Sequence, residues 1–535
     1  MVALERILMR FERWEFFIFL SLVLLFLFPI WSLAYFPTLD GQGHVYNGMV
    51  LWELVFEDNV LFEKLFAVNH DLSPNWISQP FTAFLTTEFD AFICEKILLS
   101  IYVVGFCFAF RFMIFSVKPT LKLLSLLAFL FVYHQTMILG FLNYNYGLIF
   151  LLLSIGITLR LESNARVRNI IGLSLAVLCL YFSHLIAFFI FCVFIAAFVI
   201  LLALHFILKR MSRRQFRQWI LKLFCVFLIP ISLLLVFLFN DDPSGSYIYK
   251  SRVEIWDMLF FLDGNSCVSE REWVYLRWCW IVLASCFGWI GIYAIVASLR
   301  GKEIKSPFNF DGRTMIFIVF FLLLIAACFI VPEASVGGGG GLTVRFVFMT
   351  TMIFIVCAFL VLRNRLMIAM ALLVLVYTSI DRVFFLKRDY AKHQSYCSDI
   401  ATAAKVIPQH SGILCIFDFS NEWVTAHAPK VFGTQSKSLL LDAWSQKKYS
   451  SVQWREPFRN DADLYCWEYH QWECSLELLE GKLQERVNWF VTIKADDSIE
   501  FSRPQHQHWK EFFEASCVKV FVGQSDIVIY RRKKD

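Results

Sequence analysis

The feature that most constrains this chain is a series of apolar runs, each about 20 residues long, separated by short charged segments. A run of this length fits an α-helix that crosses the hydrocarbon core of a bilayer. Charged residues make up only 17% of the 535 residues, whereas a soluble domain carries about 25%. The sequence therefore predicts a mainly α-helical polytopic membrane protein. Its net charge of +5 indicates no nucleic-acid partner, because Lys and Arg lie between the runs.

The runs predict about eleven transmembrane helices. The first run is too long for the apolar core of a signal peptide and lacks a small-residue cleavage motif, so we expect it to remain as a helix. The predicted ranges are 16–35, 96–115, 121–139, 143–160, 168–183, 185–208, 219–239, 274–299, 314–332, 346–362 and 366–385.

Lys and Arg are unevenly distributed over the loops. Twenty lie in one set of alternate loops, which includes the N-terminal segment, and five lie in the other set. Positively charged loops stay in the cytoplasm, so the N-terminus is expected there. An odd number of helices then places the first outer loop, 36–95, and the chain after 386 outside. With no Asn-x-Ser/Thr sequence in the chain, we expect an integral protein of the bacterial inner membrane, surrounded by membrane lipids.

Residues 388–535 are more polar and predict a small extracytoplasmic α/β domain after a transmembrane domain at 1–387. Five cysteines fall in this part of the chain: Cys397, Cys415, Cys466, Cys474 and Cys517. Disulfides and buried free thiols are equally favoured, and no Cys/His spacing resembles a zinc site. The patterns predict helices at 398–407 and 475–487, strands at 412–419 and 488–493, and a hairpin at 517–532.

Polar side chains gather at the outer ends of the predicted helices. A transporter is expected to carry ionisable groups near the bilayer midplane, where these helices have almost none. The stretch VGGGGGLTVR (336–345) lacks the Lys-Ser/Thr of a phosphate-binding loop and predicts a flexible outer loop. Any chemistry is thus expected at the outer surface. The gathered residues are Asp40, His44, Asn69, His70, Asp71, Asn75, His134, Asn143, Asn145, His184 and Arg345.

The first outer loop opens with Asp40. In the following stretch, Val45, Met49, Trp52 and Phe56 recur at helical spacing, which predicts an amphipathic helix lying along the membrane interface. Asp40 stands at the N-cap of that helix, a role with a value of about 1 kcal/mol. Gly41 and Gly43 would instead admit a ligand or a second backbone. On the residues alone, capping and catalysis carry equal weight.

Several short motifs are similar to those of one family. PTLDGQGHVYNG, SPNW and EKILL lie in or at the end of the first outer loop, and GFLNYNYGL and SHLIAF lie at later outer turns. This arrangement resembles the GT-C class of integral-membrane glycosyltransferases, which take sugars from polyprenyl-phosphate donors outside the cytoplasm. The resemblance implies a GT-C-like fold and a lipid, glycan or protein acceptor. It also implies Asp40 as the catalytic acidic residue and Arg345 as a ligand of the donor phosphate.

Two departures bear on cofactors. Gly41 stands where some members have the second residue of an Asp-Glu pair, and the Trp-Trp-Asp signature of oligosaccharyltransferases is absent. The sequence thus requires no cofactor, and a divalent metal stays open. A phosphorylated polyprenol leaves without a proton, so a single base suffices, in contrast to the two carboxylates of soluble glycosidases. The expected outcome is inversion, and His44 would position Asp40, bind phosphate or hold a metal.

Each candidate also has a structural interpretation. Arg345 could be an interface anchor, and Asp71 is favoured as a turn residue ahead of Pro74 over a second acidic group. His134 and His184 are favoured as core histidines, Asn143 is favoured as a turn residue, and Asn75 is carried as a further site-lining candidate. At the level of function, the alternative is a non-enzymatic glycolipid or polysaccharide carrier or flippase. A receptor is disfavoured because no cytoplasmic domain is predicted.

Overall fold

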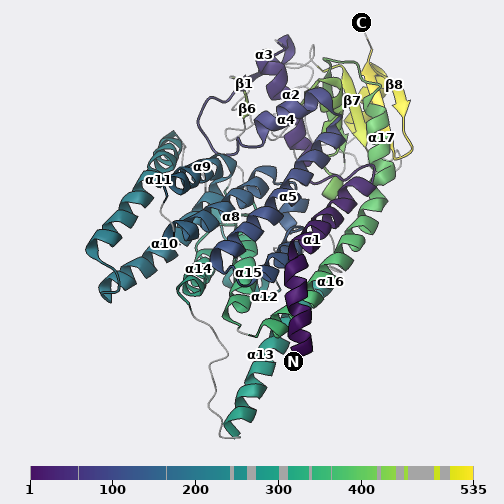
Figure 1. The fold of residues 1–535 in the computed structure, drawn as a ribbon. Coiled ribbons are helices and arrows are strands. Elements are labelled where there is room, and N and C mark those ends of the chain that lie inside the picture. Colours follow the sequence, from purple (N-terminus) through teal and green to yellow (C-terminus); the bar gives the residue numbers. More distant parts are fainter. Residues whose placement is uncertain are drawn as a thin grey trace.

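The computed structural model shows a long helical bundle with a small sheet at one end (Figure 1). It describes residues 2–57, 59–163, 166–240, 246–261, 273–299, 311–335, 340–362, 364–417, 423–441, 451–455, 487–493 and 507–533.

Seven helices in these residues are long and apolar enough to cross a membrane, and four shorter apolar stretches lie in η1–α6, α9, α13 and α14. The prediction of a mainly helical membrane protein is confirmed, while the count of eleven spans and the orientation stay predictions. The bundle consists of α1 (Val2–Ser32), α5 (Ala91–Val117), η1 (Lys122–Leu127), α6 (Ala128–Phe131), α8 (Leu142–Ser163), α9 (Val167–Ser183), α10 (Leu185–Ile207), α11 (Arg213–Asn240), α13 (Trp273–Leu299), α14 (Gly312–Cys328), α15 (Leu342–Val361) and α16 (Arg365–Tyr390).

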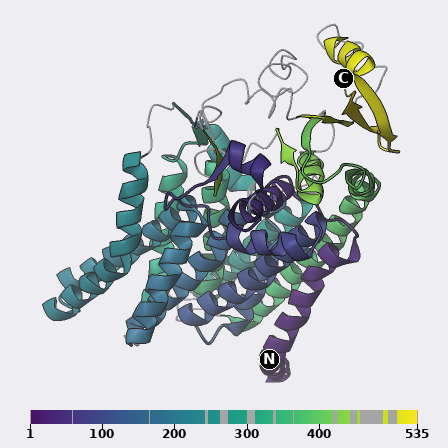
Figure 2. The same ribbon diagram turned by 90° about the horizontal axis from the view of Figure 1, so that it is seen from above.

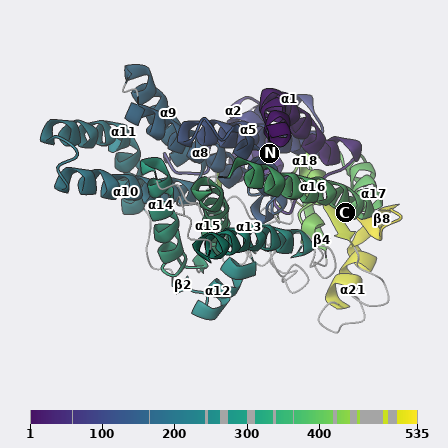
Figure 3. The same cartoon turned by 60° about the horizontal axis from the view of Figure 1, so that its bottom comes forward.

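Close helix packing holds the bundle. α5 packs along α8, and α9, α10 and α11 form a group beside them (Figure 3). A Cβ added to Gly105 would lie 2.6 Å from Ile149, and one added to Gly156 would lie 2.6 Å from Phe112. Small residues at such contacts let two helix backbones approach closely, which is the usual basis of helix association in lipid.

A buried ion pair joins the first two long helices. Arg111 of α5 lies 2.8 Å from Glu15 of α1, and Ser125 of η1 donates to the same carboxylate at 2.7 Å. The carboxylate is therefore both paired and hydrogen-bonded, as a buried charge has to be.

The first loop, residues 33–90, lies at the end of the bundle that also holds the sheet, away from the N-terminus (Figure 1). The structure does not show the single apolar face predicted for this helix, because α2 is buried on several faces, including Tyr46, Gly48 and Glu53. Its partners are α4 on one side and α18 on another, so it has no broad polar face. Its placement along the membrane interface stays a prediction. The elements of the loop are α2 (Gly41–Val55), α3 (Val60–Leu65), β1 (Phe66–Val68) and α4 (Gln79–Glu88).

The C-terminal region, residues 391–533, follows α16 almost without a break and carries a five-stranded sheet in the order β5-β4-β7-β9-β8. Strands β5, β4 and β7 are parallel, and β9 and β8 run antiparallel. Figure 2 shows its last helix and strands in yellow at the periphery. The elements are η4 (Ala391–His393), α17 (Gln394–Ala404), β4 (Gly412–Phe417), η5 (Trp423–Thr425), α18 (Lys430–Ser436), β5 (Leu439–Leu440), β6 (Val452–Trp454), β7 (Trp489–Ile493), α21 (Gln507–Ser516), β8 (Cys517–Val522) and β9 (Ile527–Arg532).

The predicted strands at 412–419 and 488–493 and the hairpin at 517–532 are confirmed by β4, β7 and the β8–β9 pair, and α17 overlaps the predicted helix at 398–407. The predicted helix at 475–487 lies, apart from its last residue, outside the described residues. Cys397, Cys415 and Cys517 are buried, whereas Cys466 and Cys474 lie outside the described residues.

Three short elements complete the fold between the later helices: α7 (Gln135–Ile138), α12 (Arg252–Phe261) and the antiparallel pair β2 (Tyr247–Ile248) with β3 (Ala334–Ser335). In the predicted Gly-rich loop, positions 336–339 lie outside the described residues. Gly341, just after them, adopts a left-handed φ of 70° ahead of α15.

Candidate functional site

Asp40 occupies the N-cap position of α2, but its side chain makes no capping hydrogen bond. The backbone N–H of Asp40 donates to the carbonyl of Leu139 at 3.0 Å, and the side chain is only 6% exposed. The Asp40 carboxylate therefore does not cap α2, which was one of the two roles that the sequence left open. A buried carboxylate that caps nothing needs another partner.

That partner is His427 of the C-terminal region. Its Nδ1 lies 2.9 Å from Oδ1 of Asp40, and the approach does not satisfy hydrogen-bond geometry. The contact is thus electrostatic when the ring is protonated, and it leaves the carboxylate able to accept a hydrogen bond from a ligand. Sequence reasoning missed His427, because the surrounding segment TAHAPK, residues 425–430, carries no recognisable motif.

Glu95 fixes the backbone on both sides of Asp40. Its carboxylate accepts hydrogen bonds from the backbone N–H of Thr38 at 2.7 Å, the Thr38 hydroxyl at 2.6 Å and the Gln42 amide at 2.5 Å. A Cβ on Gly41 would meet Glu95 Oε1 at 1.9 Å, so only glycine admits the carboxylate here. The EKILL motif therefore supplies an anchor for the Asp40 loop.

A second close approach sets the same loop against the start of α8. Gly140, with a left-handed φ of 72°, lies so close that a Cβ there would be 2.6 Å from the backbone nitrogen of Gly41. This approach depends on the missing side chain of Gly140, whereas the space beside Gly41 holds the side chains of Glu95 and Thr38.

His44 lies one helical turn after Asp40 and is hydrogen-bonded to the Gln79 amide at 3.3 Å. Burial lowers the pKa of the His44 imidazole; the charge of Asp40 raises this pKa, and that of His427 lowers it. The three side chains therefore interact electrostatically as one group. A neutral His44 can accept or donate a hydrogen bond but adds no charge.

Arg345 is the cation of the site. It is 6% exposed, and its guanidinium packs on the rings of Phe141 at 4.6 Å and Tyr144 at 5.4 Å. The negative charges of Asp40 and Glu333 interact electrostatically with the guanidinium, although neither carboxylate forms an ion pair with it. Within the part of the chain that the structure describes, its guanidinium has no hydrogen-bond or ion-pair partner, and Nε is buried.

His184 adjoins Arg345. Its Nδ1 accepts a hydrogen bond from the backbone N–H of Ile186 at 3.1 Å, which caps α10, and its ring meets Tyr144 edge-on at 5.4 Å. The charge of Arg345 acts on this imidazole. His184 thus has a capping role and also borders the group of Asp40, His44, His427 and Arg345, which we call the Asp40 site.

The remaining candidates have structural surroundings. His134 is fully buried, with Nε2 2.7 Å from the Tyr102 hydroxyl, Nδ1 2.8 Å from Thr136 and its ring stacked on Phe348. It therefore has the contacts of a satisfied core histidine. Asp71 lies on an exposed turn, where its backbone N–H is bound by the side chain of Asn69 at 2.9 Å.

Asn143 and Asn75 form a structural link. The Asn143 side chain accepts from the N–H and hydroxyl of Ser78, at 3.1 and 2.7 Å, and donates to the carbonyl of Asn75 at 2.9 Å. Asn75 has a left-handed φ of 73°. These contacts tie the end of the first loop to α8, so both residues shape the turn.

No protein-family model matches the chain, and no curated protein matches it by sequence. The described residues contain no group of three or more His, Cys, Asp or Glu side chains placed to hold a metal ion. A proposal for the chemistry of the Asp40 site therefore rests on the charges and contacts of its own residues.

Proposed function

We propose that this protein transfers a sugar from a polyprenyl-phosphate donor to a hydroxyl acceptor at the outer face of the membrane. The single observation that carries the proposal is that one site contains two buried, oppositely charged side chains. Among the described residues, the Asp40 carboxylate has one ion-pair partner and the Arg345 guanidinium has none. A partnerless buried cation is costly unless an anion binds to it. A lipid-linked phosphate supplies that anion.

In this proposal Asp40 accepts the proton of the acceptor hydroxyl as that oxygen bonds to the anomeric carbon. The bond from the anomeric carbon to the phosphate oxygen breaks, and its electron pair stays with the phosphate. Arg345 stabilises the charge that grows there, with planar donors that suit phosphate oxygens. Attack opposite to the leaving group inverts the anomeric centre.

His427 and His44 position the base. His427 approaches Asp40 to 2.9 Å, and Glu95 fixes the loop on either side. A base held in one position lowers the entropic cost of reaching a reactive geometry, and such orientation supplies a large part of enzymatic rate acceleration.

The test is a transfer assay with the full chain in lipid nanodiscs. The probes are a panel of polyprenyl-phosphate sugars and, separately, nucleotide sugars, with a lipid-linked hydroxyl acceptor. The proposal predicts transfer from a polyprenyl-phosphate sugar, with inversion, and none from nucleotide sugars. A carrier or flippase would move the lipid-linked sugar across a liposome membrane without forming a glycosidic product, and that result would contradict the proposal.

A further inference from the structure

A polar cavity of about 340 Å³ lies at the other end of α2 from Asp40. α2 has 15 residues, and a rise of about 1.5 Å per residue separates its ends by roughly 20 Å. The cavity is therefore distinct from the Asp40 site. The first loop contributes Glu53, Glu57 and Asn59 to it, and the C-terminal region contributes Gln409, His410 and Lys437.

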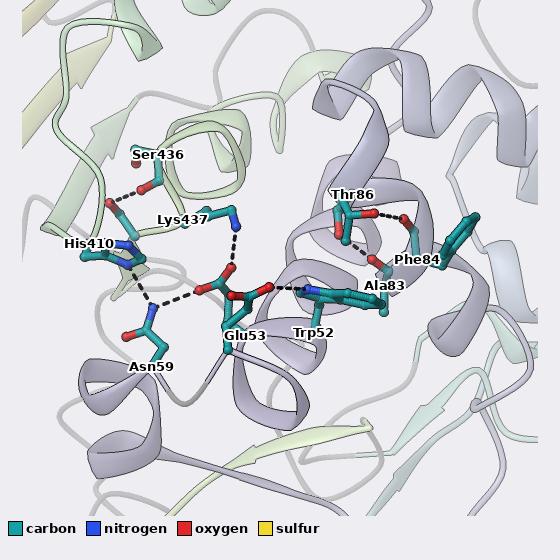
Figure 4. Close-up of polar contacts among 12 residues, drawn as sticks. Trp52, Glu53, Asn59, Ala83, Phe84, Thr86, His410, Ser436 and Lys437 are labelled. Atoms are coloured by element: carbon teal, nitrogen blue, oxygen red, sulfur yellow. Dashed lines mark hydrogen bonds and ion pairs between the residues drawn. The ribbon is translucent and has the colours of Figure 1, made fainter.

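The floor of the cavity is a buried carboxylate. Glu53 is 1% exposed, and Nζ of Lys437 lies 2.9 Å from its Oε1 (Figure 4). The same Oε1 accepts no hydrogen bond, because the ammonium lies off the required angle. Its contact is the ion pair with Lys437, and a carboxylate oxygen with one such contact can still accept a hydrogen bond from a ligand hydroxyl.

Asn59 fixes the orientation of the neighbouring groups. Its Oδ1 accepts from the N–H of Leu61 at 3.1 Å, which caps α3, so its Nδ2 must face the cavity. Nδ2 donates to Oε2 of Glu53 at 3.1 Å and contacts Nδ1 of His410 at 3.0 Å (Figure 4). Because an amide nitrogen only donates, Nδ1 of His410 is the acceptor and Nε2 carries the ring proton.

Two cavity residues have unusual backbones. His410 and Lys437 adopt left-handed φ values of 58° and 48°, a conformation that costs a non-glycine residue about 1–2 kcal/mol. Lys437 stands at the C-cap of α18, a position that glycine normally takes. A lysine there places an ammonium over Glu53, and strain of this kind clusters at ligand sites.

We propose that this cavity binds a sugar residue of the acceptor, an uncharged ligand rich in hydroxyl groups. Its carboxylates, amides and imidazole offer donors and acceptors side by side, as hydroxyls require. Two carboxylates against one ammonium disfavour a phosphate. Among the described residues that line the cavity, Val60 alone is apolar, which disfavours a lipid chain. Trp52 donates to Glu57 at 3.2 Å and holds that carboxylate at the rim.

The assignment to an acceptor rests on the proposed function. At roughly 20 Å from Asp40, the cavity cannot hold the reacting hydroxyl, so it would hold a more distant sugar of an oligosaccharide. The binding of the sugar itself depends only on the cavity.

The test is calorimetric titration of the full chain in lipid nanodiscs with methyl glycosides of glucose, galactose, mannose and N-acetylglucosamine. At least one glycoside should bind saturably. Glu53→Gln, Glu57→Gln and His410→Asn should each weaken binding about tenfold or more, the effect of a lost charged or buried hydrogen bond. Glu57 is exposed, so its variant tests binding without a risk to folding, and Asn tolerates the left-handed backbone.

The matched control is Glu88→Gln, an exposed carboxylate in the last turn of α4, which should leave binding unchanged. Absence of binding by every glycoside, equal binding by wild type and cavity variants, or competition by inorganic phosphate would each overturn the proposal. Asp40→Asn should keep glycoside affinity. Glycoside binding without any transfer activity would leave the cavity assigned and reject the proposed function, and transfer without glycoside binding would do the reverse.

Discussion

Two buried carboxylates close to the start of α2, Asp40 in the first loop and Glu95 in α5, behave differently. Glu95, 1% exposed, accepts three hydrogen bonds from Thr38 and Gln42, whereas Asp40, 6% exposed, has one ion-pair contact with His427. A carboxylate that its own chain hydrogen-bonds in this way holds structure, because both of its oxygens already accept from neighbouring groups. The Asp40 carboxylate keeps its capacity to accept a proton, and we assign the chemistry to it.

Arg345 extends the comparison to a cation, and among the residues around Asp40 its removal should have the largest effect. Arg345→Ala deletes a charged donor group worth about 1.5–3 kcal/mol, so the KM for the lipid-phosphate donor should rise at least tenfold. The KM for acceptor should change little. Steady-state kinetics with both substrates varied checks this.

Arg345→Lys is the matched control, since it keeps the charge and loses the planar donors, and should fall between wild type and Arg345→Ala. A larger effect on acceptor than on donor would reassign Arg345.

Glu95 tests the structural half of the comparison. Glu95→Gln would set two amide groups against each other at Gln42 and should reduce the stability of the folded protein by about 1–3 kcal/mol. The exchange Glu95→Gln with Gln42→Glu restores one donor and one acceptor and should recover most of that loss. Thermal unfolding in nanodiscs measures both. A stable Glu95→Gln protein that has lost transfer entirely would reverse the roles given to the two carboxylates.

Substitution of His427 tests whether the ion-pair partner of Asp40 contributes to the rate of transfer. His427→Ala should lower kcat about tenfold and leave both KM values near wild type, because the ring orients the base without touching substrate. Single-turnover rates under saturating substrate report this. A pure rise in KM would instead make His427 a substrate ligand.

The smallest expected effect is a pH dependence from His44. Burial lowers the pKa of its imidazole in the folded protein, while in the unfolded chain the pKa is about 6.5. Below about pH 6.5 the unfolded chain therefore binds a proton that the folded protein does not, and stability falls as pH falls. Between pH 7 and 6 the loss should be about 1 kcal/mol or less.

His44→Gln should flatten this slope in unfolding measurements at several pH values. Asp40 and His427 face the same imidazole, and the charge of Asp40 raises the pKa of His44, so Asp40→Asn should steepen the slope. An unchanged slope in both variants would remove His44 from the group.

Some of this could be predicted from the sequence because the signals were local. The apolar runs gave the bundle, the alternation in 517–532 gave the β8–β9 hairpin, and the position of Asp40 after the first run marked the site. The single apolar face predicted for α2 is wrong because its spacing indicates one apolar partner, whereas both α4 and α18 pack against the helix.

Other features of the site have no local signal. His427 meets Asp40 only because the C-terminal region folds back on the first loop, and a lone histidine in a turn predicts nothing. EKILL was noted as a motif, but the three donors around Glu95 come from a distant loop. The absence of an ion-pair partner for Arg345 among the described residues likewise depends on which side chains reach it, and tertiary packing determines that.

The most direct test of the account is sugar transfer by Asp40→Asn in nanodiscs, measured in a single turnover with saturating polyprenyl-phosphate sugar. The substitution keeps the size of the side chain and removes the base, so the rate should fall by about 10²–10⁴, while donor affinity and thermal unfolding stay near wild type. A variant that folds, binds donor and transfers sugar at the wild-type rate would contradict the assignment of Asp40.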